Sequence, residues 1–108
     1  MTEIDEKTIQ EMQILEQKLQ NSMLQKQSFQ MELAETNSAL EEIDKSGDEV
    51  FKIIGQLMIK SEKSKIKEEL LNKLKILELR IKSFDKQESF LNEQLEKLRE
   101  EVTKSMSE

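Results

Sequence analysis

The side chains that most often catalyse reactions or bind metals are absent from this sequence. The 108 residues include no histidine and no cysteine, so the common nucleophile, general-base and zinc arrangements cannot form. Adjacent carboxylates such as Glu41-Glu42 lie in charged stretches with a helical rhythm, where such pairs are normally solvated. Gly47 and Gly55 are too far apart for a phosphate-binding loop. The sequence therefore predicts a protein that is not an enzyme and that needs no cofactor or metal.

The polar side chains with the most informative placement are Ser22, Lys26 and Glu88, because each interrupts a regular apolar repeat. If the chain folds back at its centre, pairing Ile43 with Leu70 or a near neighbour brings both Ser22 and Lys26 level with Glu88. We expect Lys26 to reach Glu88, in a polar layer that fixes the register of the pairing at some cost in stability. The alternative is that three solvated residues coincide where the apolar seam is thin.

Two heptad-like repeats would position this layer. Steps of three and four residues alternate along each repeat, and most positions are apolar. The first repeat comprises Met12, Leu15, Leu19, Ser22, Lys26, Phe29, Leu33, Thr36, Leu40 and Ile43. The second comprises Leu70, Leu74, Leu77, Ile81, Phe84, Glu88, Leu91, Leu95, Leu98 and Val102. A spacing of about 3.5 residues held over this length is typical of a coiled-coil seam rather than a broad amphipathic face.

The phase of the two repeats distinguishes two architectures. Continued forward, the first repeat loses its apolar residues after Leu57, and the second starts in another phase at Leu70. A single continuous helix would need a skip there and would carry two glycines at about 1 kcal/mol each. A chain that folds back at its centre needs neither. We therefore expect a mainly α fold, a long antiparallel two-helix coiled-coil hairpin with helices over 5–46 and 64–105, in a single domain spanning 1–108.

Signals at the ends of these helices favour the fold-back. Gly47 closely follows the first helix, which predicts a left-handed cap at its C-terminus. Ser64, or less favourably Ser61, precedes the second helix and predicts a side-chain cap at its N-terminus. The two helices are also nearly equal in length, as a hairpin requires.

The segment between the helices, residues 49–60, is rich in β-branched residues, and Gly55-Gln56 suits a two-residue turn. That turn would pair Ile54 with Leu57 and leave apolar side chains on both faces of a β-hairpin with two open edges. The helices point away from it, so the β-hairpins of several chains would join edge to edge in an oligomeric β-barrel. The predicted assembly residues are Val50, Phe51, Ile53, Ile54, Gly55, Leu57, Met58 and Ile59. A helical period also fits much of the segment, and the alternative is a buried turn of an ordinary helical bundle.

The stretch "EVFKIIGQLMIK", flanked by two coiled-coil arms of equal length, resembles the prefoldin β-subunit family, and the resemblance covers nearly the whole chain. It implies a hexamer of two α and four β subunits, in which the β-hairpins build a β-barrel platform that carries six coiled coils. It also implies a chaperone that captures unfolded proteins without ATP and passes them to a group II chaperonin in the cytosol. In this chain, residues 50–60 would form the assembly segment.

Near the two chain ends, apolar residues leave the seam. Ile4 and Ile9 are off the first repeat, and Val102 and Met106 lie opposite them in a folded-back chain. Exposed apolar groups at the end of a mobile coiled coil could hold non-native chains, and methionine adapts to varied partners. Largely because of the family resemblance, we expect these four residues to bind client proteins. The alternative is that Ile4 and Ile9 belong to a frayed end without a role.

Charge and hydropathy argue against other classes of partner. The net charge is -6, and basic residues are interleaved with acidic ones, so we expect no binding to nucleic acid or to a membrane surface. No apolar run is long enough to span a bilayer, and the first five residues do not resemble a signal peptide. We therefore expect a cytoplasmic protein. A second functional class stays open: a structural coiled-coil adaptor that binds one folded partner and holds no unfolded clients.

Overall fold

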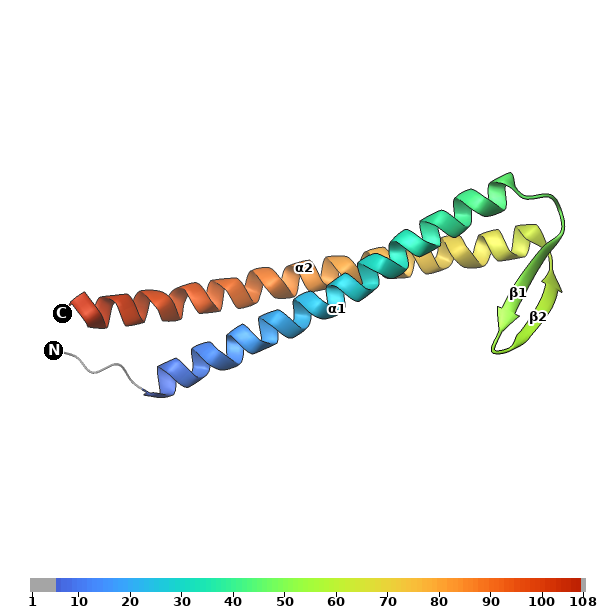
Figure 1. The fold of residues 1–108 in the computed structure, drawn as a ribbon. Coiled ribbons are helices and arrows are strands. Elements are labelled where there is room, and N and C mark those ends of the chain that lie inside the picture. The colour runs from blue at the N-terminus through green and yellow to red at the C-terminus, as the bar shows by residue number, and fades with distance from the viewer. Residues whose placement is uncertain (1–5, 108) are drawn as a thin grey trace. The chain divides into compact units, whose positions relative to one another are not determined.

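The computed structural model describes residues 6–107, which form two long helices joined by two short strands. Helix α1 spans Glu6–Lys45, strands β1 and β2 span Val50–Ile54 and Leu57–Ser61, and helix α2 spans Lys63–Ser107 (Figure 1). The fold is therefore mainly α with a central antiparallel β-hairpin, as predicted. Within the described residues, no helical stretch is long and apolar enough to cross a membrane.

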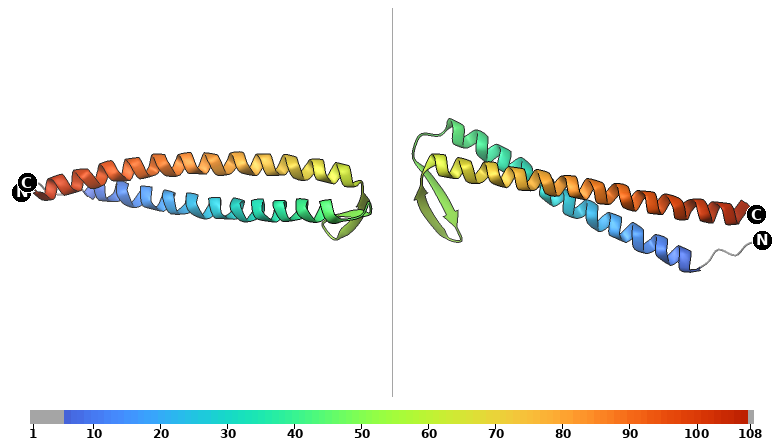
Figure 2. Two further views of the ribbon diagram at one scale, coloured as in Figure 1. Left: turned by 90° about the horizontal axis from the view of Figure 1, so that it is seen from above. Right: turned by 180° about the vertical axis from the view of Figure 1, so that it is seen from behind.

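The chain divides into two compact units. The hairpin unit comprises residues 28–81, which include the end of α1, both strands and the start of α2. The arm unit comprises residues 1–27 and 82–108, of which 6–27 and 82–107 are described. Within each unit, a part of α1 lies beside a part of α2 that runs in the opposite direction, and Figure 2 shows this pairing from two further sides. The chain thus folds back, and the alternative of one continuous helix is wrong.

The two heptad repeats form the seam of each unit. Every position of both predicted repeats is buried or half-buried. The most deeply buried side chains are Thr36, Ile43 and Leu77 in the hairpin unit, and Ser22, Leu91 and Leu95 in the arm unit. Burying one leucine side chain contributes roughly 1.5–3 kcal/mol, so a seam one side chain wide is sufficient to hold two helices together only when it is long.

The C-terminal end of α1 differs from the sequence prediction. Gly47 does not adopt a left-handed conformation; among the described residues, the positive φ angle belongs to Gly55. The hydroxyl of Ser46 instead donates a 2.8 Å hydrogen bond to the carbonyl of Ile43. The N–H of Ser46 also donates to the carbonyls of Glu42 and Ile43, so Ser46 binds the carbonyls of the last turn and the helix can end without a left-handed glycine.

The N-terminal end of α2 also differs. The helix begins one residue before Ser64, and the N–H of Ile66 donates a 3.1 Å hydrogen bond to the carbonyl of Glu62. The hydroxyl of Ser61 donates to the carbonyl of Ile59 at 3.4 Å. The flanking position of the helix is therefore Glu62, and both predicted serine caps are wrong. The reason is that a single residue, Glu62, connects the end of β2 to the start of α2. The capping position is therefore Glu62, and neither serine occupies it.

The β-hairpin has the predicted register. Ile54 lies opposite Leu57, and the pairing continues to Val50 opposite Ser61. The turn consists of Gly55-Gln56, and Gly55 has a φ angle of 60°, which residues with a side chain rarely adopt. A two-residue turn with glycine first fixes which residues face one another, and hence which side chains share a face.

Candidate functional site

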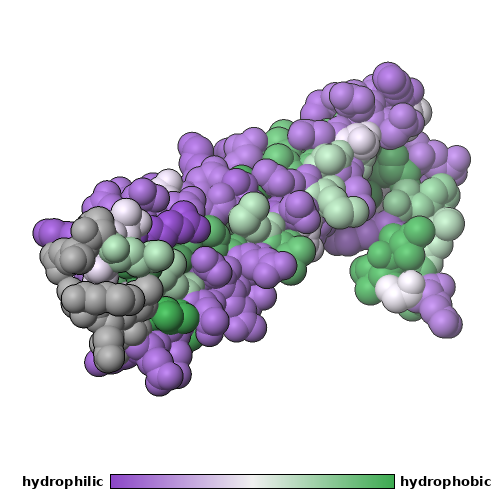
Figure 3. Space-filling view, turned by 60° about the vertical axis from the view of Figure 1, so that its left-hand side comes forward, coloured by the Kyte–Doolittle hydropathy of each residue, from purple (hydrophilic) through white to green (hydrophobic). Residues whose placement is uncertain are grey.

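The candidate functional site is the surface of the β-hairpin, where all the predicted assembly residues lie. Its large apolar side chains keep between 44% and 69% of their surface exposed: Phe51, Ile53, Ile54, Leu57, Met58 and Ile59. Val50, at the start of β1, is half-buried. Figure 3 shows apolar side chains gathered on the β-hairpin in the face that it presents. Contiguous exposed apolar surface of this kind marks a site of interaction with another chain.

The two strands also present open edges. Within the described residues, β1 and β2 form a sheet with no further strand. The pair that flanks a two-residue turn is hydrogen-bonded, and bonded and non-bonded pairs alternate along the ladder. The outward N–H and C=O groups therefore belong to Phe51 and Ile53 on β1, and to Met58 and Lys60 on β2. Such edges accept a strand from another chain.

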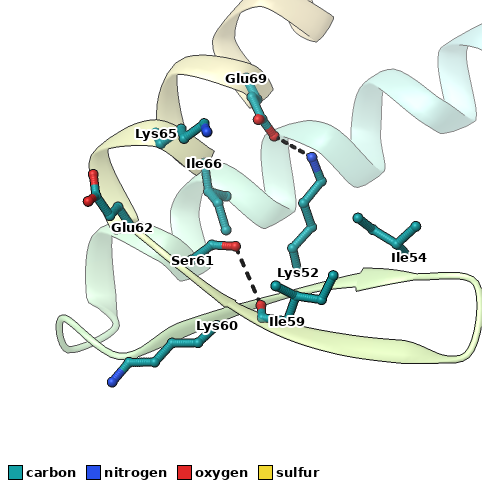
Figure 4. A pocket seen from close by; sticks show the side chains of 9 residues that line it. All are labelled: Lys52, Ile54, Ile59, Lys60, Ser61, Glu62, Lys65, Ile66 and Glu69. Atoms are coloured by element: carbon teal, nitrogen blue, oxygen red, sulfur yellow. Dashed lines mark hydrogen bonds and ion pairs between the residues drawn. The ribbon is translucent and has the colours of Figure 1, made fainter.

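An ion pair ties the β-hairpin to α2. The Nζ atom of Lys52, on β1, lies 2.9 Å from the Oε2 atom of Glu69. Figure 4 shows Lys52, Ile54 and Ile59 on the side of the strands that faces α2, and Lys60 on the other side. Residues of this inner side line a shallow cavity of about 390 Å³ between the strands and α2. The inner face of the β-hairpin is thus held to α2 by an ion pair, and side chains do not fill the space between them.

Two lysines of α2 hold the end of α1 at the base of the β-hairpin. The Nζ atom of Lys63 donates a 2.8 Å hydrogen bond to the carbonyl of Ser46, and the Nζ atom of Lys67 lies 2.7 Å from the Oδ1 atom of Asp44. The hydrogen bond from Lys67 holds the pKa of the Asp44 carboxyl below its usual range. Sequence reasoning missed these contacts. Two lysines four residues apart in the first turns of the second helix are the signal that could have indicated them.

An apolar groove of about 760 Å³ runs beside β1 in the hairpin unit. Its apolar lining comes from both helices as well as from the strand: Ala39, Ile43, Val50, Phe51, Ile53, Ile66 and Leu70. Ser46, glutamates and lysines complete the lining, so the groove combines apolar and charged side chains. Exposed apolar surface therefore extends from the strands onto the helix ends, which the strand pattern alone did not identify.

The predicted client-binding residues belong to the arm unit. Ile9 is 41% exposed and Met106 is 72% exposed, whereas Val102 is half-buried at its seam position. Ile4 lies outside the described residues. Client binding by these residues stays a prediction, and the exposed side chains of Ile9 and Met106 are the ones available for it.

Lys26 and Glu88, two polar seam residues of the arm unit, lie close together, and Asp85, which the sequence analysis did not indicate, also contacts Lys26. The Nζ atom of Lys26 lies 3.4 Å from the Oε2 atom of Glu88 and 2.5 Å from the Oδ1 atom of Asp85. The buried hydroxyl of Ser22 donates a 3.5 Å hydrogen bond to the Oε1 atom of Gln87 rather than to Glu88. The hydrogen bond to Asp85 is the main cause that raises the pKa of Lys26. Asp85 was missed because it lies beside the seam, one turn before Glu88.

Known proteins resemble this chain along most of its length. A family model described as prefoldin subunit matches residues 6–108. The prefoldin subunit beta of Thermococcus onnurineus is 42% identical over 89 residues, which cover 81% of this chain and 77% of that protein. The prefoldin subunit beta of Pyrobaculum calidifontis is 38% identical over 91 residues, which cover 82% of this chain and 73% of that protein.

A solved structure has the same fold. The crystal structure of the prefoldin beta subunit from Thermococcus strain KS-1 matches with a TM-score of 0.87 at 34% sequence identity, and the match covers 97% of this chain and 96% of that chain. The matched residues include both helices and the whole β-hairpin. The chain therefore belongs to the prefoldin family, as one of its β subunits.

Proposed function

We propose that this chain works within a hexamer of two α and four β subunits, which captures unfolded proteins without ATP and delivers them to a group II chaperonin in the cytoplasm. The observation that carries the proposal is the β-hairpin, where six large apolar side chains and two open strand edges are exposed together. Membership of the prefoldin family supports this form of assembly.

The β-hairpin needs partners for two physical reasons. A two-stranded hairpin alone in water is marginal, and its exposed edges favour pairing with further strands. Side chains such as Ile53 and Leu57, each two-thirds exposed, would gain roughly 1–2 kcal/mol each on burial in a shared barrel. We propose that β-hairpins of the α subunit and of other copies of this chain cover these surfaces.

Client capture would use apolar side chains that the seam leaves outside. Besides Ile9 and Met106, the helices expose Ile14, Met23, Leu24, Met31, Leu71, Ile76, Leu79 and Phe90. Each such contact is weak and unspecific, but several arms that act on one client raise its effective affinity. The sequence offers no phosphate-binding loop, so release would depend on competition by the next chaperone and not on nucleotide hydrolysis.

The assembly step is tested by native mass spectrometry of the chain mixed with a prefoldin α subunit. We expect a complex of two α and four β subunits. Ile53→Asp combined with Met58→Asp places two charges side by side on one face of the β-hairpin, since these residues are paired across the strands. The double variant should abolish the complex, because a barrel would bury both carboxylates without partners. Leu79→Asp, an equally exposed apolar residue on α2, is the matched control and should leave assembly intact.

The capture step is tested by suppression of the aggregation of a denatured model protein, without ATP. The wild-type complex should suppress aggregation, and Ile9→Ser combined with Met106→Ser should weaken suppression while the hexamer still forms. A hexamer that holds no denatured protein, but binds one folded partner stoichiometrically, would instead identify the chain as a structural adaptor.

A further inference from the structure

The seam of the arm unit contains charges at positions where a coiled coil normally has leucine. Lys26 and Glu88 occupy seam positions of α1 and α2, and their side chains are only 21% and 20% exposed. Lys26 is shared between Glu88 and Asp85, and these three residues are called the charged layer. Within the described residues, the Oε1 atom of Glu88 is buried without a hydrogen-bond partner. Leaving a carboxylate oxygen unsatisfied lowers stability, so the layer is not explained by stability.

Another polar seam residue shows what a harmless interruption looks like. Thr36, in the hairpin unit, is 3% exposed, and its hydroxyl donates a 2.8 Å hydrogen bond to the carbonyl of Glu32 on its own helix. Its polar group is therefore satisfied whichever residue of α2 lies opposite. Among the residues that the structure describes, the partners of Lys26 and Glu88 lie on the other helix. The charged layer can distinguish one pairing register from another, and Thr36 cannot.

A shift of one heptad is the alternative register that competes most closely. Because heptad positions repeat, such a shift keeps apolar residues opposite apolar residues along most of the seam. The charged layer is where the shift is penalised. A shift in one direction would place Glu88 opposite Leu33 and Lys26 opposite Leu95. A shift in the other direction would place Glu88 opposite Leu19 and Lys26 opposite Ile81.

We propose that the charged layer locks α1 and α2 into one register, at the expense of stability. Lys26 precedes the end of α1 at Lys45 by 19 residues, 45 minus 26. The contacts that clamp Ser46 and Asp44 to α2 act at that end. The charged layer supplies a second fixed point farther along the same helix. Lys26 is thus a positioning residue, with Asp85 and Glu88 as its partners.

Pairs of engineered cysteines joined by a bifunctional thiol cross-linker can report the register, because the chain contains no cysteine. A cross-linker is used because long side chains that meet at their tips leave the Cα atoms too far apart for a direct disulfide. The side chains of Glu16 and Arg99 meet across the seam, with Oε1 3.9 Å from Nη2. Glu16→Cys with Arg99→Cys therefore reports the native register. Glu16→Cys with Asn92→Cys, and Glu16→Cys with Met106→Cys, report shifts of one heptad in the two directions. The measurement is the fraction of the monomeric product that carries an intramolecular cross-link, by mass spectrometry.

In the chain with its charged layer intact, we expect the native pair to cross-link and both shifted pairs to cross-link only at a low level. Lys26→Leu combined with Glu88→Leu gives an apolar seam that accepts either register, and should raise the shifted cross-links roughly tenfold while the melting temperature rises or stays equal. Thr36→Leu is the matched control and should raise neither. Shifted cross-links that stay at the starting level in the double-leucine variant would overturn the proposal. So would an equal rise with Thr36→Leu, or zero coupling between Lys26 and Glu88 in a double-mutant cycle.

Discussion

The ammonium of Lys63 donates a 2.8 Å hydrogen bond to the backbone carbonyl of Ser46, so the first residue of α2 closes the end of α1. The last carbonyls of a helix have no partner in their own helix, and a positive charge there complements the helix dipole. The two helices are therefore held together at the base of the β-hairpin by a contact between the side chain of one and the backbone of the other.

Removing this contact should loosen the base of the β-hairpin. We expect Lys63→Met to lower the free energy of unfolding by about 1 kcal/mol, since it removes a charged donor from a helix end but keeps an apolar stem. Chemical unfolding followed by circular dichroism measures the effect. Lys65→Met, an exposed position in the same turn, should change little, and an equal loss in both variants would contradict the assignment.

Asp44 should make stability depend on acid pH. The hydrogen bond from Lys67 keeps its pKa in the folded chain below the usual 3.8. The unfolded chain therefore takes up the proton at a higher pH than the folded chain. The stabilisation is complete above that usual value and is lost as the pH falls through the folded pKa.

Melting temperatures measured from about pH 6 down to about pH 2 should therefore fall less steeply for Asp44→Asn than for the wild type. Lys67→Gln removes the partner and should flatten the same part of the curve. A wild-type slope in both variants would show that this pair does not contribute to the acid transition.

The two glycines should respond differently to alanine. Gly55 has a φ angle of 60°, and nothing lies near the added methyl group, so Gly55→Ala should cost about 1 kcal/mol through the backbone alone. Gly47 has no positive φ angle and the same open surroundings, so Gly47→Ala should be neutral or slightly stabilising. Thermal unfolding of the two variants compares them directly. A larger loss at Gly47 would restore the left-handed cap that the structure excludes.

The outer edge of β1 should tolerate the loss of a side chain better than the loss of an N–H group. Ile53→Pro removes an outward donor and keeps the β1–β2 ladder. We expect it to weaken assembly with an α subunit at least about tenfold, measured by native mass spectrometry across a dilution series. Ile53→Val keeps the N–H and should assemble normally. Equal assembly of the two would show that strand addition does not use this edge.

The seam should be sensitive to truncation where it is fully closed. Leu95 is 1% exposed, whereas Leu79 on the same helix is 67% exposed. Leu95→Ala should cost about 2–4 kcal/mol, and Leu79→Ala should cost less than about 0.5 kcal/mol. Chemical unfolding of the two variants measures the contrast. Comparable losses would mean that the seam is not the main source of stability.

The seam and the β-hairpin register could be predicted because each follows from a single repeating rule. Alternating steps of three and four residues identified which side of each helix is covered, down to the polar position of Thr36. The turn at Gly55-Gln56 fixed the strand pairing, since a two-residue turn leaves no freedom in register. Lys26 could be predicted to lie near Glu88 because, in an antiparallel pair of helices, residues that are equally far from the central turn lie opposite each other.

The helix caps and the second partner of Lys26 could not be predicted, because in each case several residues of the sequence were suitable. Gly47 and Ser46 could both end α1, and the sequence does not indicate that the Ser46 hydroxyl bonds the Ile43 carbonyl while Lys63 bonds the Ser46 carbonyl. The serine cap failed because β2 continues into α2 through Glu62. Asp85 is one of many surface carboxylates in the sequence, and the direction of the Lys26 side chain distinguishes it from the rest.

The β-hairpin is attached unequally to its two helices. One residue, Glu62, separates β2 from α2, and Lys52 of β1 is also bound to α2 through Glu69. Ser46, next to the end of α1, is also bound to α2 through Lys63, so residues 47–49 connect two points that are each bound to α2. An assembly that fixes the strands would therefore fix the first turns of α2 more directly than the end of α1.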